Sequence, residues 1–600
     1  MKKLIILLVG LIVFSAGSFA DIPRFYGEEI VVTALRVPRL KSSIPWDTTV
    51  ITREDIEDST AAKIGDIIRT VPGVSVKANG GLSSQISARL RGSNSQQVLV
   101  LLNGNRINSP SLGTFDLGDI LLTDVERIEI VKAPLSSLYG ADAVGGVINI
   151  ITRKATEKPE VVVSAGYGEY ATRNLSVAGS GPNYFFSAAA IDSDGFRANS
   201  AYRAQDLNLR LMNGYFEAGI KKCNTDKGSP GSLDFLTPQA RQSDKNMFYD
   251  LVYKADKAGL KATLSQATLD QKYENPTFAI LSTHKTTSTN LNIQESIGDY
   301  VAGLEIRNDN SRSTNSGNHD LTNKAVYAQA ELGPMVIGAR EDITSSYGSH
   351  FNPRVGFVFN LRHDTLLKTS WGKSFKAPTI DDLYWSRLTE PGWPSGVVTT
   401  EGNPNLKPET SQSFDITLER KLSHKSSARL SYYVNQIKDM IRWTNTSTST
   451  IDAFWTPTNI SDADIQGIEF EYEKEIAKYL KTFINFGYQL AKDAGSGNFL
   501  DYAPQNQLNA GLKYRDPDKF DSNIVVRYVG ERYTNLVNST QLPSYTVVDL
   551  SLSKDFGIYT IKGEVENLFG ESYAESYGFS DVYPMPGRRY NISVQLRINN

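Results

Sequence analysis

Side chains that carry covalent or metal chemistry are scarce in this sequence. Its 600 residues include five histidines and a single cysteine, Cys223. We find no nucleophile elbow, no H-E-x-x-H pair and no Cys–His cluster with metal-ligand spacing. An enzyme is therefore not expected, and the chemistry that remains is recognition by main-chain pairing and hydrogen bonding.

The segment 28–36 is the first candidate for such recognition. It reads EEIVVTALR, which is apolar and β-branched, and Gly27 and Pro38 flank it. An apolar strand without a partner at an exposed chain end is an aggregation hazard. We therefore expect this strand to be kept for pairing with another protein.

The first 20 residues predict export. Lys2 and Lys3 precede an apolar run, and Ser18-Phe19-Ala20 offers small residues at a cleavage site, so 1–20 is a signal peptide. No later run approaches the ~18 apolar residues of a membrane-spanning helix. The lone cysteine excludes an internal disulfide, and a net charge of −3 gives no reason to expect a nucleic-acid partner.

Residues 44–154 predict a small α+β domain that follows an N-terminal segment, 21–43. Apolar residues at helical spacing predict a helix over 61–69, which Pro72 and Gly73 end. The run 98–102 is a fully apolar strand before an Asn-Gly turn, and a helical stretch is expected around 124–127.

Residues 155–600 change to a period-two pattern that continues to the end of the chain. In the last segment apolar residues alternate with polar ones: Tyr590, Ile592, Val594, Leu596 and Ile598. This alternation indicates half-buried strands, and the length allows about 20 to 24 spanning strands. We predict an all-β transmembrane barrel of about 22 antiparallel strands, with the α+β domain as a plug inside its lumen.

Several motifs, in order and spacing, resemble those of TonB-dependent outer-membrane receptors, and most closely the members that transport cobalamin. The motifs cover 29–34, 90–94, 98–104, 125–132, 138–150, 374–378, 402–409, 566–569 and 586–588. The resemblance implies a monomeric receptor in the bacterial outer membrane, surrounded by lipid. It also implies a TonB box at about 28–36, to which TonB adds a strand. The residues of the box are Glu29, Ile30, Val31, Val32, Thr33 and Ala34.

The cargo implied by the resemblance is cobalamin, and a ferric siderophore is the alternative within the family. Heme is disfavoured, because no histidine lies between His363 and His424, where heme receptors carry a ligand. The plug loops are neutral and polar, which suits the amide-rich cobalamin better than an anionic siderophore. From other classes, a passive porin needs neither plug nor pairing strand, and a secreted adhesin would not reside in the membrane.

The resemblance also assigns ligand-facing residues in two plug loops, although Asn, Ser and Gly are equally typical of plain turns. These residues are Asn79, Gln85, Ser87, Asn94, Leu112 and Gly113. Elsewhere in the plug, pairing with barrel carboxylates such as Glu469 and Glu471 is one interpretation of Arg91, Arg127 and Lys132, and ordinary solvated ion pairs are the alternative.

No cofactor is required, and calcium is the one ion that the resemblance suggests. The region that matches the calcium-binding loops supplies carboxylates, but it is shorter and has an arginine at one ligand position. The candidate ligands are Asp192, Asp194, Asp206 and Asp234. Scattered surface aspartates are the competing interpretation.

Overall fold

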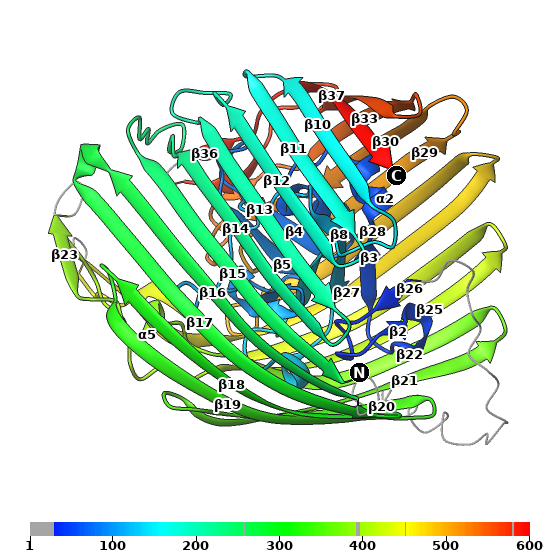
Figure 1. The fold of residues 1–600 in the computed structure, drawn as a ribbon. Coiled ribbons are helices and arrows are strands. Elements are labelled where there is room, and N and C mark those ends of the chain that lie inside the picture. The colour runs from blue at the N-terminus through cyan, green and yellow to red at the C-terminus, as the bar shows by residue number, and fades with distance from the viewer. Residues whose placement is uncertain (1–28, 256–258, 392–395, 450–451, 579–580, 600) are drawn as a thin grey trace.

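The computed structural model describes residues 29–599, except 256–258, 392–395, 450–451 and 579–580. The expected signal peptide and Glu28 lie outside the described residues. The N-terminal elements lie inside a ring of long strands formed by the rest of the chain (Figure 1). Among the helices of the described residues, none is long and apolar enough to cross a membrane.

The N-terminal part is built around a five-stranded sheet in the order β3-β8-β9-β6-β7, in which β6 and β9 are parallel. A separate hairpin, β4–β5, lies beside it. Its elements are β1 Ile30–Val31, β2 Arg39–Leu40, η1 Lys41–Ser43, β3 Thr48–Ile51, α2 Arg53–Asp58, α3 Ile64–Ile67, η2 Ile68–Thr70, β4 Val74–Ala78, β5 Ile86–Leu90, η3 Ser95–Gln97, β6 Val98–Leu102, β7 Asn105–Arg106, β8 Val125–Val131, α4 Ser136–Tyr139 and β9 Gly146–Thr152.

Local sequence explains most of these elements. All five residues of β6 are buried, as expected for an apolar strand inside a sheet. Thr52 and Asp55 cap α2 reciprocally. The helix predicted over 61–69 is a single α turn followed by a 3₁₀ turn. The prediction of a helix around 124–127 is wrong, because the strand β8 begins at Val125. A bulge between Val125 and Arg127 disturbs the alternation of side chains that would have indicated a strand.

The remainder forms a closed barrel, which confirms the predicted fold. Within the described residues 22 antiparallel strands close the ring, and β10 pairs with β37. The strands are β10 Glu160–Gly168, β11 Thr172–Gly181, β12 Tyr184–Ser193, β13 Tyr202–Asn213, β14 Phe216–Gly228, β15 Arg241–Ala255, β16 Leu260–Asn275, β17 Ile280–Ile297, β18 Tyr300–Ser313, β19 Gly317–Leu332, β20 Met335–Thr344, β21 Gly348–Arg362, β22 Thr365–Lys376, β25 Glu409–Ser423, β26 Ser426–Asn445, β27 Ala453–Ala477, β28 Leu480–Asp493, β29 Asn506–Arg515, β30 Asp521–Val529, β33 Tyr545–Asp555, β34 Tyr559–Glu566 and β37 Arg589–Asn599.

Shorter elements occupy the connections between barrel strands. The hairpin β23–β24 lies between β22 and β25, which pair directly with each other. The short elements are η4 Pro276–Phe278, α5 Ile380–Tyr384, β23 Leu388–Pro391, β24 Val397–Thr400, β31 Arg532–Tyr533, β32 Gln541–Leu542, β35 Ala574–Tyr577 and β36 Val582–Pro584.

The two faces of the barrel strands differ in chemistry, as β13 illustrates. Leu207, Leu209 and Leu211 are about half exposed on the outside, whereas Asp206 and Asn208 are buried toward the plug. This dyad pattern places apolar side chains toward lipid and polar ones toward the lumen. It averages out in composition, which is why the mean hydropathy of −0.31 resembles that of a soluble protein.

Candidate functional site

A cavity of about 730 Å³ lies between the plug loops and the inner face of the barrel. Its volume falls within the range typical of small-molecule sites, about 300–1,000 Å³. Amide side chains from the barrel, including Asn246, Gln271 and Asn535, contribute to its wall. Five of the six residues assigned from the plug loops line it as well: Asn79, Gln85, Ser87, Asn94 and Leu112.

The plug residues in this wall are held in defined positions. The Gln85 side-chain amide donates to Gln242 Oε1 over 2.8 Å, and Asn79 Oδ1 accepts from the Ser576 hydroxyl over 2.8 Å. The Asn94 amide N–H donates to Gln97 Oε1, which fixes the start of η3. Within the described residues Asn94 Oδ1 is buried without a hydrogen-bond partner, so it is available to a donor on a ligand.

Gly113, the sixth assigned residue, does not line this cavity. It contributes to a separate void of about 40 Å³ and adopts φ +75°. Its N–H donates to the Ser109 carbonyl over 2.7 Å, and an added Cβ would lie 2.8 Å from a Thr379 methyl. A left-handed backbone in a crowded turn accounts for the glycine.

Sequence reasoning missed the aromatic and charged residues in the wall. Trp443 on β26 lines the cavity and donates from Nε1 to Asp382 Oδ1 over 3.0 Å. Lys77, Arg89 and Arg442 line it too. The expected neutral pocket is therefore wrong in part. Lys77 and Arg89 reach the cavity from β4 and β5, which flank the first plug loop, and Arg442 reaches it from β26 of the barrel. The alternation of polar and apolar residues along β26 indicated which of its side chains point into the lumen, but not which of them reach this cavity.

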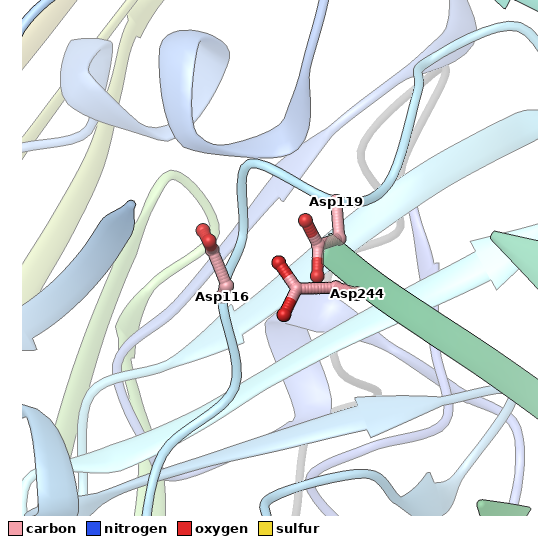
Figure 2. A group of neighbouring side chains, drawn as sticks. All are labelled: Asp116, Asp119 and Asp244. Atoms are coloured by element: carbon pink, nitrogen blue, oxygen red, sulfur yellow. The ribbon is translucent and has the colours of Figure 1, made fainter. Parts of the chain in front are cut away.

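Three carboxylates form one acidic group in the same wall (Figure 2). Asp116 and Asp119 come from the plug loop after β7, and Asp244 comes from β15. Lys227 Nζ lies 2.6, 2.5 and 3.0 Å from their oxygens, so an ammonium is the cation that they surround. Burial, together with the charges of Asp244 and Asp116, raises the pKa of Asp119 to about 7 despite Lys227.

The aspartates assigned to calcium do not come together. Asp192 is more than half exposed on the outer face and pairs with Arg203, whereas Asp206 is buried toward the plug and pairs with Lys221 over 2.6 Å. Asp194 is exposed, and Asp234 accepts from the Ser232 hydroxyl. Successive strand residues point to opposite faces, so Asp192 and Asp206 cannot form one ligand set here. The carboxylates grouped in the described residues are Asp116, Asp119 and Asp244 instead.

The expectation that the segment 28–36 is an unpaired strand is also wrong for the residues of it that the structure describes, 29–36. Ile30 and Val31 pair with Leu40 and Arg39 of the same chain. Ile30 is 55% exposed, but Val31, Thr33 and Ala34 are fully buried. The segment is therefore docked against the plug and contributes to its packing.

Glu129 of β8 is the main polar contact of this docked segment. Its Oε2 accepts from Val32 N (3.0 Å), Thr33 N (2.8 Å) and Thr33 Oγ1 (2.6 Å). Tyr139 donates its hydroxyl to the Thr33 carbonyl, and Asn149 donates its side-chain amide to Thr33 Oγ1. A buried carboxylate with three donors is a strong local contact.

Side chains of the barrel contact the next residues of the N-terminal segment, Ala34 to Arg36. Gln329 on β19 donates to the Leu35 carbonyl over 3.0 Å, and Arg354 on β21 donates to the Ala34 carbonyl over 3.2 Å. Arg36 Nη2 lies 3.1 Å from a carboxylate oxygen of Glu305 on β18. The N-terminal segment thus joins the plug to the barrel wall.

A buried charge network joins the plug to a further part of the barrel wall, strands β25 and β27. Arg91 pairs with Asp47 of the plug and with Asp415 and Glu469 of the barrel, at 2.5 to 2.9 Å. Lys132 Nζ lies 2.7 Å from Glu469 and 3.8 Å from Glu471. The expected pairing of Arg91 and Lys132 with barrel carboxylates is present.

Arg127 differs from this expectation, since it pairs with Glu129 inside the plug over 2.9 Å. It thereby supports the carboxylate that holds the N-terminal segment.

Comparisons with known proteins agree with this architecture. Residues 155–568 match the family described as TonB dependent receptor-like, beta-barrel, and residues 41–147 match the TonB-dependent Receptor Plug Domain. Two curated relatives carry the name vitamin B12 transporter BtuB. The one from Vibrio vulnificus is 29% identical and the alignment covers 95% of each chain; the one from Photobacterium profundum is 27% identical over 92% and 93%.

Solved structures show the same fold at lower identity. The ferric enterobactin receptor of Pseudomonas aeruginosa superposes with a TM-score of 0.77 at 18% identity, covering 92% of this chain and 99% of that one. The siderophore receptor PirA of Acinetobacter baumannii gives 0.76 at 19%, covering 92% and 98%. A plugged 22-stranded barrel, the matched barrel and plug families and the full-length relatives together assign the chain to the TonB-dependent receptors of the bacterial outer membrane.

Proposed function

We propose that this receptor takes up cobalamin across the outer membrane, driven by TonB. The observation that carries the proposal is the cavity of about 730 Å³, in which neutral amide and hydroxyl groups from plug and barrel converge. Cobalamin carries many peripheral amides, and such a wall offers them both donors and acceptors. The full-length relatives named vitamin B12 transporters support the same cargo.

The energy for uptake enters through the N-terminal segment. TonB adds a strand to residues 29–34, so that main-chain hydrogen bonds provide the affinity. In the structure Thr33 is fully buried, so the segment must leave Glu129 before a second chain can pair along it. Cargo binding drives this release only if it favours the released state over the docked one.

A ferric siderophore is the second candidate. The observation that favours it is the presence of Lys77, Arg89 and Arg442 in the cavity wall, since cations suit anionic chelates. Against it stands the acidic group of Asp116, Asp119 and Asp244, which would repel a chelate of high negative charge.

Titration of the purified full-length receptor with cobalamin and with a panel of ferric siderophores decides between them. We expect cobalamin to bind below about 1 μM, which is the range of a specific uptake receptor. Trp443, in the cavity wall, gives the fluorescence signal, and Trp443→Phe is the control for its origin. Absence of cobalamin binding together with tight siderophore binding would overturn the assignment.

Uptake by cells tests the coupling separately. Ile30→Pro removes a main-chain donor from the strand, so transport should be lost while cargo binding to the purified protein persists. Normal transport by this variant would contradict strand addition at residues 29–34.

A further inference from the structure

Three cationic side chains meet in one part of the cavity wall, and we call them the cationic patch: Lys77, Arg89 and Arg442. Lys77 lies on β4 and Arg89 on β5. The register Ser75↔Arg89 and Lys77↔Ser87 places them diagonally on one face of the hairpin. Arg442 reaches the same cavity from β26 of the barrel.

The patch has more positive charge than its carboxylates balance. Arg89 donates to the Asp501 carbonyl over 2.7 Å and to Asp501 Oδ2 over 3.1 Å, and Arg442 Nη2 lies 3.2 Å from Asp501 Oδ1. Lys77 Nζ lies 4.2 Å from the centre of the Tyr502 ring. In the described part of the chain no ion pair is found for Lys77, so one carboxylate serves three cations.

Two of these cations also keep a donor unused. The side chain of Arg89 is 8% exposed, and its Nε is buried without a hydrogen-bond partner among the residues described. The Nε of Arg442 is in the same state. Buried donors are normally satisfied, and the Nε–Nη edge of a guanidinium fits two oxygens of one anion. The patch therefore has the charge and the free donors of an anion site.

The charge elsewhere in the wall limits which anion fits. The acidic group of Asp116, Asp119 and Asp244 surrounds Lys227 alone and so carries excess negative charge. A ligand with several anionic groups would face repulsion there, whereas a ligand with one anionic group and many amide donors would match both parts. Cobalamin has this character, because the phosphodiester of its nucleotide loop is its one anionic group on an amide-rich periphery.

We propose that Lys77, Arg89 and Arg442 form a subsite for the phosphodiester of cobalamin, an inference that rests on the proposed function. The patch then determines which corrinoids bind well: those with a nucleotide loop are preferred over those without it. The amide-lined part of the cavity holds the corrin ring of both classes of corrinoid, with or without the nucleotide loop.

Binding of cobalamin and of cobinamide, a corrinoid without the nucleotide loop and its phosphodiester, tests the subsite. The purified full-length receptor is titrated with each, as wild type, Arg442→Gln and Lys77→Gln. We expect both variants to weaken cobalamin binding by about tenfold or more, and cobinamide binding by less than about threefold. The matched control is Arg387→Gln, whose side chain is 64% exposed outside the patch; it should leave both affinities unchanged.

The outcomes separate the two proposals. Equal weakening of both corrinoids, or no weakening of either, would overturn the phosphodiester subsite while cobalamin remains the cargo. Failure of the wild-type receptor to bind either corrinoid would overturn the proposed function and the subsite with it. Lys77→Gln guards against misfolding, since this residue makes no ion pair in the described part of the chain that its loss could disrupt.

Discussion

Replacing Glu129 with glutamine should release the N-terminal segment without cargo. Glu129 is fully buried, and its Oε2 accepts three hydrogen bonds from Val32 and Thr33. Glutamine keeps the shape and one acceptor but removes the charge. Its NH₂ group would also face the Arg127 guanidinium, which now donates to Glu129 Oε1 over 2.9 Å.

The size of the effect follows from these contacts. A hydrogen bond to a charged group contributes about 1.5–3 kcal/mol, against about 0.5–1.5 kcal/mol for a neutral one. Losing roughly 1 kcal/mol from each of three bonds that share one acceptor gives about 2–3 kcal/mol in total. This shifts the balance between docked and released segment by roughly 30- to 150-fold.

The affinity of a soluble TonB fragment for the cargo-free receptor measures this shift. A partner that binds only the released state has an apparent affinity reduced by the fraction released, so Glu129→Gln should bind tighter by roughly 30- to 150-fold. The matched control is Glu126→Gln, an exposed carboxylate on the same strand. A spin label at Ile30→Cys should gain mobility in parallel, since Ile30 is exposed and Cys223 is fully buried.

An unchanged TonB affinity and an unchanged label spectrum in Glu129→Gln would refute the reasoning. Either the segment would then be released already in the wild type, or Glu129 would not hold it.

Three further predictions concern the charged groups. Arg91→Gln removes the ion-pair partner that the described residues offer to buried Asp415 and one partner each of Asp47 and Glu469, so the free energy of plug unfolding in denaturant should fall by about 3–5 kcal/mol. The control is Arg515, whose side chain is 40% exposed where it pairs with Asp58, and Arg515→Gln should cost less than about 1 kcal/mol. Burial and the neighbouring Arg89 lower the pKa of Lys77 to about 8. Cobalamin affinity should therefore fall as the pH rises through about 8, and Lys77→Arg should remove that dependence; a flat wild-type profile would contradict the role of Lys77. The raised pKa of Asp119, about 7 against 3.8, means that the folded protein retains a proton that the unfolded chain releases. The free energy of unfolding should thus decline between about pH 4 and 7, and Asp119→Asn should flatten that decline; an identical slope in both proteins would show that Asp119 does not titrate there.

The sequence by itself determined the architecture. Period-two alternation reports which side chains face lipid, because strand geometry places successive residues on opposite faces. It therefore predicted the barrel, and the length of the segment 155–600 predicted about 22 strands. The apolar run 98–102 predicted the buried plug strand β6. Motif order placed five of the six plug-loop residues in the wall of the cavity.

Only the tertiary structure decided which distant side chains meet. The partner of Thr33 is Glu129, 96 residues further along the chain, and Arg91 meets Glu469 across 378 residues. Arg442 joins Lys77 and Arg89 because barrel closure sets which part of β26 faces the plug hairpin. Strand periodicity acts over a few residues, whereas these contacts depend on the register of every strand pair around the ring. For the same reason residues 29–36 looked unpaired in sequence and are docked in the fold.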